Sequence, residues 1–177
     1  MKTKFSFLLV LLLMLVVGIQ PAVAKKPLTT ITFDELPEHV IMGSEYIKGA
    51  TIEYLGVTGF AIFGDGSAPG LDYIQDKCLW GYPKGEMMIT FDKPTSVLEF
   101  GVAIATNDML AHTVIIDLYK PGNGSLRDSV TLSTAPKYAA SETLFTYHGA
   151  AIERVVIRFT ESEWDYGFMI DNIVFHG

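Results

Sequence analysis

Short runs of apolar residues, many of them alternating with polar ones, fill most of the chain after residue 29 and predict β-strands. Turn residues separate these runs, most clearly the Lys-Pro-Gly-Asn-Gly stretch at 120–124. No stretch sustains a helical period with capping residues, although a single turn is compatible with 39–46. The expected strands span 30–36, 50–54, 56–63, 86–92, 96–105, 112–119, 126–132, 143–147, 152–159 and 168–175.

About ten short strands joined by turns are typical of a β-sandwich or a β-barrel. The pair of cysteines and the intervening tryptophan of an antibody-type domain are missing, since Cys78 is the only cysteine. We therefore predict an all-β jelly-roll β-sandwich of two antiparallel sheets, with the first and last strands together in one sheet. One domain is expected at 29–177, preceded by a short tail at 25–28.

Residues 1–24 have the organisation of a secretory signal peptide. A basic start precedes an apolar run at 5–17, and the small residues at 22–24 match a cleavage site. The run is about 13 residues long, whereas a membrane-spanning helix needs roughly 20. The chain is thus expected to begin at Lys25 after cleavage and to be secreted or periplasmic, without a membrane partner.

The charge is strongly acidic, with 13 basic and 20 acidic residues and a net charge of −7. Loss of the two leader lysines leaves 11 basic residues and a net charge of −9. This balance argues against nucleic acid and anionic membranes as partners. It is compatible with neutral sugars and with cations. Cys78 lies next to Leu79 and Trp80 and is expected to be a small buried hydrophobe.

Carboxylates occur among apolar residues in both the first and the last predicted strand. Asp34 and Glu35 belong to the first, and Asp171 belongs to the last. An unpaired charge is costly to bury, so one cation bound between neighbouring end strands would satisfy both sides. The alternative is that these groups cap turns or face water. Asn172 adds an amide oxygen, but in a regular strand it points to the opposite face from Asp171.

Four segments resemble exported bacterial β-sandwich domains. They are ITFDELP at 31–37, MITFDKPTSV at 88–97, IIDLY at 115–119 and GFMIDNI at 167–173. Such domains are similar to carbohydrate-binding modules of the jelly-roll type and to the ectodomains of PEP-CTERM-type, exosortase-sorted proteins. The chain ends at Gly177 without a sorting tail, which favours a freely secreted or periplasmic product. The resemblance implies a structural Ca²⁺ between the end strands, held by Asp34 or Glu35 together with Asp171.

Aromatic residues are the candidate sugar-binding groups, because a sugar ring packs its C–H groups on an aromatic face. Tyr73, Trp80 and Tyr82 occur within ten residues of one another, and Trp164 precedes the last predicted strand. Each of them is also compatible with a half-buried position in the core.

Sequence signatures of enzymes are missing from the chain. It contains no G-x-S-x-G, no P-loop and no dinucleotide fingerprint, and its four histidines lack metal-binding spacing. We therefore expect a secreted, non-catalytic binding domain for an oligo- or polysaccharide. The alternatives are a structural or matrix-interaction protein without sugar affinity and, third, a small polysaccharide-acting enzyme that uses paired carboxylates.

Overall fold

Antiparallel strand pairing accounts for nearly all of the regular structure. The computed structural model describes residues 26–56, 62–65, 70–106, 108–160 and 167–177, which form twelve strands. Across these ranges there is no helix with the length and apolarity needed to cross a membrane. The strands are β1 (Leu28–Ile31), β2 (His39–Val40), β3 (Ser44–Ile47), β4 (Ala50–Gly56), β5 (Ile62–Asp65), β6 (Lys77–Gly81), β7 (Gly85–Ala105), β8 (Thr113–Tyr119), β9 (Leu126–Ser133), β10 (Ala135–Lys137), β11 (Ala140–Phe159) and β12 (Gly167–His176).

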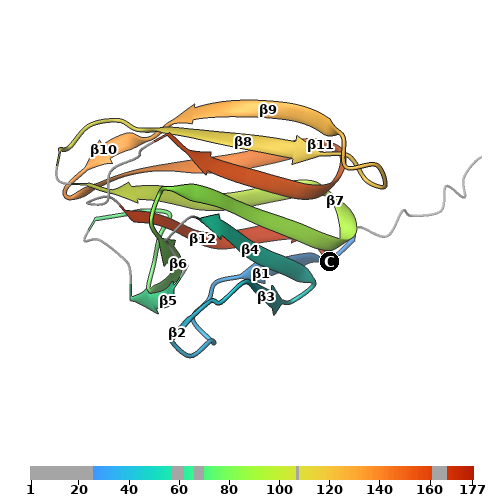
Figure 1. Cartoon of the computed structure of the whole chain (residues 1–177), viewed down its shortest axis with the longest axis horizontal. Coiled ribbons are helices and arrows are strands. Elements are labelled where there is room, and N and C mark those ends of the chain that lie inside the picture. The colour runs from blue at the N-terminus through green and yellow to red at the C-terminus, as the bar shows by residue number, and fades with distance from the viewer. Residues whose placement is uncertain (1–25, 57–61, 66–69, 107, 161–166) are drawn as a thin grey trace, which may run out of the picture.

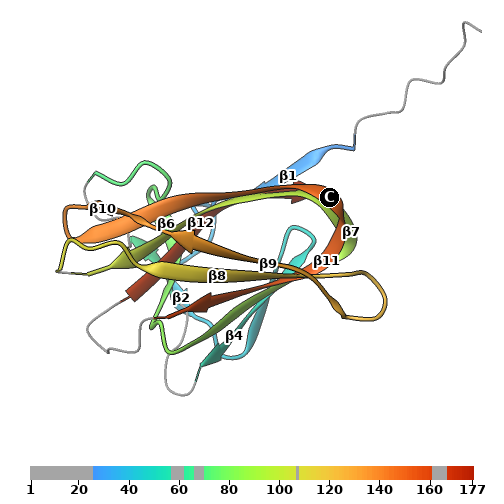
Figure 2. The ribbon, with the colours of Figure 1, turned by 90° about the horizontal axis from the view of Figure 1, so that it is seen from above.

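Two long strands, β7 and β11, pass from one layer of the molecule to the other. They pair with each other along both halves, and their register shifts between His148 and Arg154. Extra residues on one strand bend a ladder locally, which lets the two strands turn the corner together. Figure 2 shows both strands bending at the end of the molecule that holds the C-terminus.

The bend divides the strands into two antiparallel sheets of a jelly-roll sandwich (Figure 1). The first sheet joins the C-terminal half of β7 and the N-terminal half of β11 to β12, β1, β6 and β10. Strands β5 and β2 extend it beyond β6. The second sheet joins the other halves of β7 and β11 to β4, β3, β8 and β9. The predicted fold class is thereby confirmed.

The main core lies between the sheets and is built from inward-facing aliphatic and aromatic residues. Aromatic pairs join the two layers. Phe159 of β11 stacks on Phe168 of β12 with ring centroids 4.5 Å apart, and Phe91 of β7 contacts Phe175 of β12 at 4.9 Å. Such aromatic pairs stabilise the fold by more than the apolar area that they bury would contribute.

The first and last strands are neighbours, as predicted from their sequences. Strand β1 pairs antiparallel with β12, from Leu28 opposite His176 to Ile31 opposite Ile173. The predicted strand at 30–36 was too long, however. Phe33 has φ 65°, and the N–H of Leu36 donates to the carbonyl of Phe33 at 3.0 Å, so a turn follows Ile31. Asp34 and Glu35 therefore lie in that turn.

Other strand boundaries also differ from the prediction. The runs at 86–92 and 96–105 form one bent strand, as do those at 143–147 and 152–159. The possible turn of helix at 39–46 is instead β2 and β3. Strands β6 and β10 were missed, because their lengths of five and three residues are too short to show a period. The predicted leader at 1–24 lies outside the described residues.

Candidate binding surface and acidic junction

A loop at residues 70–76, called here the covering loop, lies across the outer face of the first sheet. Its Ile74 is buried together with Cys78, Ala103, Ala140 and Met169 in a second, smaller apolar cluster. Cys78 is fully buried, which confirms its predicted place as a small hydrophobe. The centre of the first sheet is thus covered on both faces, by the second sheet on one side and by this loop on the other.

Small residues in β7 allow the covering loop to approach the sheet. Gly101, Ala103 and Ala105 face outward in the C-terminal half of β7, beneath the loop. A Cβ on Gly101 would lie 2.4 Å from the carbonyl oxygen of Tyr73 and 2.8 Å from its Cβ. Glycine is required at this position because the backbone of the loop occupies the space of a side chain.

Two buried carboxylates fasten the covering loop to the sheet. The first is Glu142 of β11, whose exposure is only 1%. Its Oε1 accepts the N–H of Asp72 at 2.8 Å, and its Oε2 accepts the N–H of Tyr73 at 3.0 Å. The ammonium of Lys137 lies 3.5 Å from Oε1 and only 2.7 Å from Oδ2 of Asp72. Hydrogen bonds to an ionised acceptor are stronger than neutral ones, so this group holds the loop firmly.

The second carboxylate is Asp171 of β12, which is also 1% exposed. Its Oδ2 accepts the N–H of Gln75 at 3.0 Å and Nδ2 of Asn172 at 3.1 Å, while Oδ1 accepts the N–H of Asn172 at 2.6 Å. Asn172 has φ 55°, and the register with β7 shifts at this point. The strand is therefore irregular here, and the Asn172 amide reaches the same side as Asp171, also donating to the carbonyl of Tyr73 at 3.3 Å.

Asp171 sits where β1 ends, β6 begins and β12 is irregular, beside Asp34 and Asp76. We call these three residues the acidic junction. Burial raises the pKa of Asp171 from its ordinary 3.8 to about 7, although the N–H donors of Gln75 and Asn172 oppose the rise. The negative charges of Asp34 and Asp76 make a smaller contribution to this rise in pKa. The junction therefore places one buried carboxyl group beside two solvent-exposed aspartates.

The two candidate metal ligands that follow β1 have different surroundings. Oδ1 of Asp34 accepts the N–H of Lys77 at 3.2 Å, two residues after Gln75, whose N–H donates to Asp171. Glu35 instead forms an exposed ion pair with Lys48 and accepts the hydroxyl of Thr32 at 3.1 Å. Among the described residues, no three His, Cys, Asp or Glu side chains are close enough together to hold a metal ion by themselves.

The predicted aromatic residues occupy different positions along the covering loop and β6. Tyr73 is 38% exposed above Gly101. Trp80 is half-buried and meets the ring of Tyr82 edge-on, with centroids 5.4 Å apart. A Cβ on Gly167 would lie 2.7 Å from Nε1 of Trp80, so the indole packs closely on β12. Trp164 lies outside the described residues.

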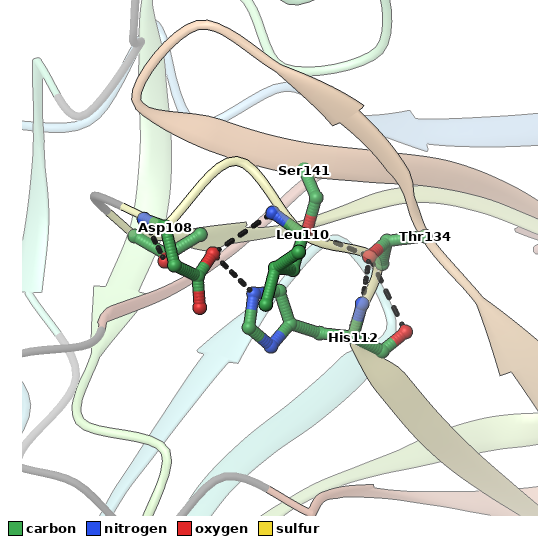
Figure 3. Close-up of polar contacts among 6 residues, drawn as sticks. Asp108, Leu110, His112, Thr134 and Ser141 are labelled. Carbon is green, nitrogen blue, oxygen red and sulfur yellow. Dashed lines mark hydrogen bonds and ion pairs between the residues drawn. The ribbon is translucent and has the colours of Figure 1, made fainter.

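A separate polar cluster surrounds the buried side chain of His112 (Figure 3). Its Nε2 lies 3.2 Å from Oδ1 of Asp108, which also accepts the N–H of Leu110 at 2.9 Å. The hydroxyl of Thr134 accepts the N–H of His112 at 2.8 Å and lies 2.6 Å from Oγ of Ser141. The hydroxyl groups thus contact the backbone of His112 and each other rather than its ring, which is not the geometry of a Ser-His-Asp nucleophile. The cluster fastens the β7–β8 loop.

Sequence reasoning missed Glu142, Asp76 and the Asp72–Lys137 pair. Glu142 lies between Ser141 and Thr143, just before the predicted strand at 143–147, so it lacked the apolar neighbours that drew attention to Asp171. Asp76 and the ion pair offered no such signal, because their partners are 65 or more positions away in the chain.

Comparison with known proteins supports the fold. No protein-family model and no curated protein sequence matches the chain. The K1 cleaved adhesin domain of Lys-gingipain from Porphyromonas gingivalis W83 has a TM-score of 0.50 and 11% identity, over 84% of this chain and 97% of that one. The K2 cleaved adhesin domain of Lys-gingipain gives the same values. The xylan-binding domain of carbohydrate-binding module family 22 is more distant, with a TM-score of 0.46 and 13% identity over 87% and 96%. The chain is therefore a β-sandwich whose fold resembles that of the Lys-gingipain adhesin domains.

Proposed function

We propose that this protein is an exported, non-catalytic domain that binds carbohydrate and holds a structural calcium ion. The observation that carries the sugar-binding part is the placement of Tyr73, whose ring is partly exposed while its backbone is fixed. Its N–H is bound by Glu142, its carbonyl by Asn172, and its Cα region rests on Gly101. A rigid aromatic surface loses little conformational entropy when a ligand binds.

The same region supplies the polar groups that sugar hydroxyls need. Asp72 and Gln75 are exposed on either side of Tyr73 in the covering loop. Trp80 and Tyr82 add apolar aromatic surface farther along the chain. Ligand contacts commonly concentrate on such loops because a β-sandwich holds them in place.

The calcium part of the proposal concerns the acidic junction. A buried carboxylate beside two other negative charges is stabilised by a divalent cation, and calcium accepts backbone and amide carbonyls among its six to eight oxygen ligands. Asp171 and Asp34 fit this role, and Asp76 is the third nearby carboxylate. Asp34 and Glu35 are the two candidate calcium ligands that follow β1. The geometry favours Asp34, because Glu35 forms an ion pair with Lys48.

Sugar binding is tested with a glycan array and pull-down by insoluble polysaccharides. We expect the wild type to bind and Tyr73→Ala to weaken that binding, since its ring is a contact surface and its fixed backbone remains. Trp80→Ala and Tyr82→Ala are measured alongside, and Tyr46→Ala is the control because Tyr46 is 63% exposed on β3 in the other sheet. Absent binding, or binding that is indifferent to all three site variants, would refute this function.

Calcium binding is tested by thermal unfolding with and without a chelator. A ligand of the native state at about 100 times its Kd adds roughly 2.7 kcal/mol, which raises Tm by about 5–10 °C for a domain of this size. We expect Asp34→Asn to lose most of this shift and Glu35→Gln to keep it. An unchanged Tm in calcium and in chelator would remove the metal from the proposal and leave the sugar-binding part standing.

A further inference from the structure

Tyr138 presents the most exposed aromatic ring of the described side chains, at 75%. It lies in the tight turn between β10 and β11, a position that sequence analysis did not connect with Tyr73. Lys137, the residue before it, pairs with Asp72, the residue before Tyr73, at 2.7 Å. This ion pair joins segments 65 positions apart, and an exposed tyrosine follows each of its two residues in the chain.

We propose that Tyr73 and Tyr138, joined by the Asp72–Lys137 ion pair, form one subsite for a neutral oligosaccharide. The inference rests on the proposed function, which it deepens by naming a residue set and a ligand class. It differs from the platform predicted in sequence, because Tyr138 replaces Trp80 and Tyr82 as the partner of Tyr73.

Both tyrosines stand on a fixed backbone. The covering loop is held by Glu142, with distances of 2.8 and 3.0 Å to the N–H groups of Asp72 and Tyr73. On the other side, Lys137 pairs in register with Ala140 across the turn. The carbonyl of Ala139, a residue with φ 58°, accepts the N–H of Thr106 at 3.2 Å. A non-glycine residue held at positive φ indicates that its surroundings determine the turn.

The exposed groups of this surface match the chemistry of a sugar. Two aromatic rings offer apolar faces for C–H groups, and Leu144, 37% exposed, adds apolar surface opposite Gly101 in the ladder. The Asp72 carboxylate is 68% exposed and accepts hydroxyl protons, while the Lys137 ammonium, 32% exposed, donates. A neutral glycan is favoured over an acidic one because the chain carries a net charge of −7.

The test is calorimetric titration with xylohexaose, cellohexaose, mannohexaose and a hexamer of galacturonic acid. The proteins are the wild type, Tyr138→Ala, Tyr138→Phe, Lys137→Met and the control Tyr46→Ala. Loss of one stacking ring is worth about 1.4 kcal/mol, so Tyr138→Ala should weaken binding about tenfold. Tyr138→Phe keeps the ring and should stay within about twofold of the wild type. Lys137→Met should weaken binding, and Tyr46→Ala should leave it unchanged.

Folding does not confound the Tyr138 variants, because that ring is mostly exposed. Lys137 also contacts Glu142, so Tm is measured for every variant to separate a loosened loop from a lost ligand contact. A neutral hexamer that binds Tyr138→Ala as tightly as the wild type overturns the inference alone, while sensitivity to Tyr73→Ala would keep the proposed function. Tighter binding of the galacturonic acid hexamer overturns the neutral ligand class. A wild type that binds no hexamer and no glycan on the array overturns both the proposed function and the subsite.

Discussion

Lowering the pH from 7 to 5 in the presence of a chelator is expected to stabilise the folded protein through Asp171. Burial and the neighbouring Asp34 and Asp76 raise its pKa in the folded state to about 7, against an ordinary value of 3.8. The folded state therefore binds this proton more tightly than the unfolded chain does. The resulting stability is fully present below the unfolded pKa and is lost as the pH rises through about 7.

The size of the effect follows from the separation of the two pKa values. One pKa unit corresponds to about 1.36 kcal/mol, so Asp171 contributes about 2 kcal/mol more at pH 5 than at pH 7, and about 3 kcal/mol more at pH 4. Other carboxylates titrate over the same range. The informative quantity is therefore the free energy of unfolding of the wild type minus that of Asp171→Asn, which cannot titrate at this position.

The assay is urea unfolding at several pH values, with the exposed Glu38→Gln as the control. In chelator, the difference between wild type and Asp171→Asn should grow in favour of the wild type as the pH falls. With calcium, the proposed ion competes with the proton, and the wild type should instead be more stable at pH 7 than at pH 5. A difference independent of pH in chelator would show that Asp171 stays ionised and that the argument from burial is wrong.

Three further substitutions test the packing and charge arguments. Gly101→Ala should destabilise by about 1–3 kcal/mol in urea, because its Cβ meets the backbone of Tyr73; wild-type stability would contradict the close approach. Glu142→Gln should cost about 1–3 kcal/mol and speed hydrogen exchange at 70–76, since charged acceptors for two N–H groups are lost; unchanged exchange would contradict its anchoring role. Arg158→Met should cost about 1–2 kcal/mol, because Asp117 is 5% exposed and 2.5 Å from the Arg158 guanidinium. Adding Asp117→Asn should recover part of that loss, because it removes the carboxylate that has lost its partner. A double variant no more stable than Arg158→Met would contradict this explanation.

The acidic junction shows how far a residue pattern can locate a site. Asp171 stood out because a charge among apolar strand residues needs a partner, and the adjacency of β1 and β12 places Asp34 near it. The detailed geometry of the acidic junction could not be predicted from the sequence. The positive φ of Phe33 ends β1 before Asp34, and that of Asn172 turns its amide to the side of Asp171. Both depend on how neighbouring strands meet, which no local pattern encodes.

The sequence by itself determined that the chain is a β-sandwich with neighbouring end strands and a buried cysteine. The alternation of apolar with polar residues and the positions of turn-forming residues are local properties of the sequence. The alternation decides which face of each strand enters the core. Only the tertiary structure decided that β7 and β11 cross between sheets, that a loop covers Gly101, and that Lys137 pairs with Asp72. Those features arise from contacts between segments distant in the chain, where packing and charge pairing select among conformations that local propensity leaves equally available.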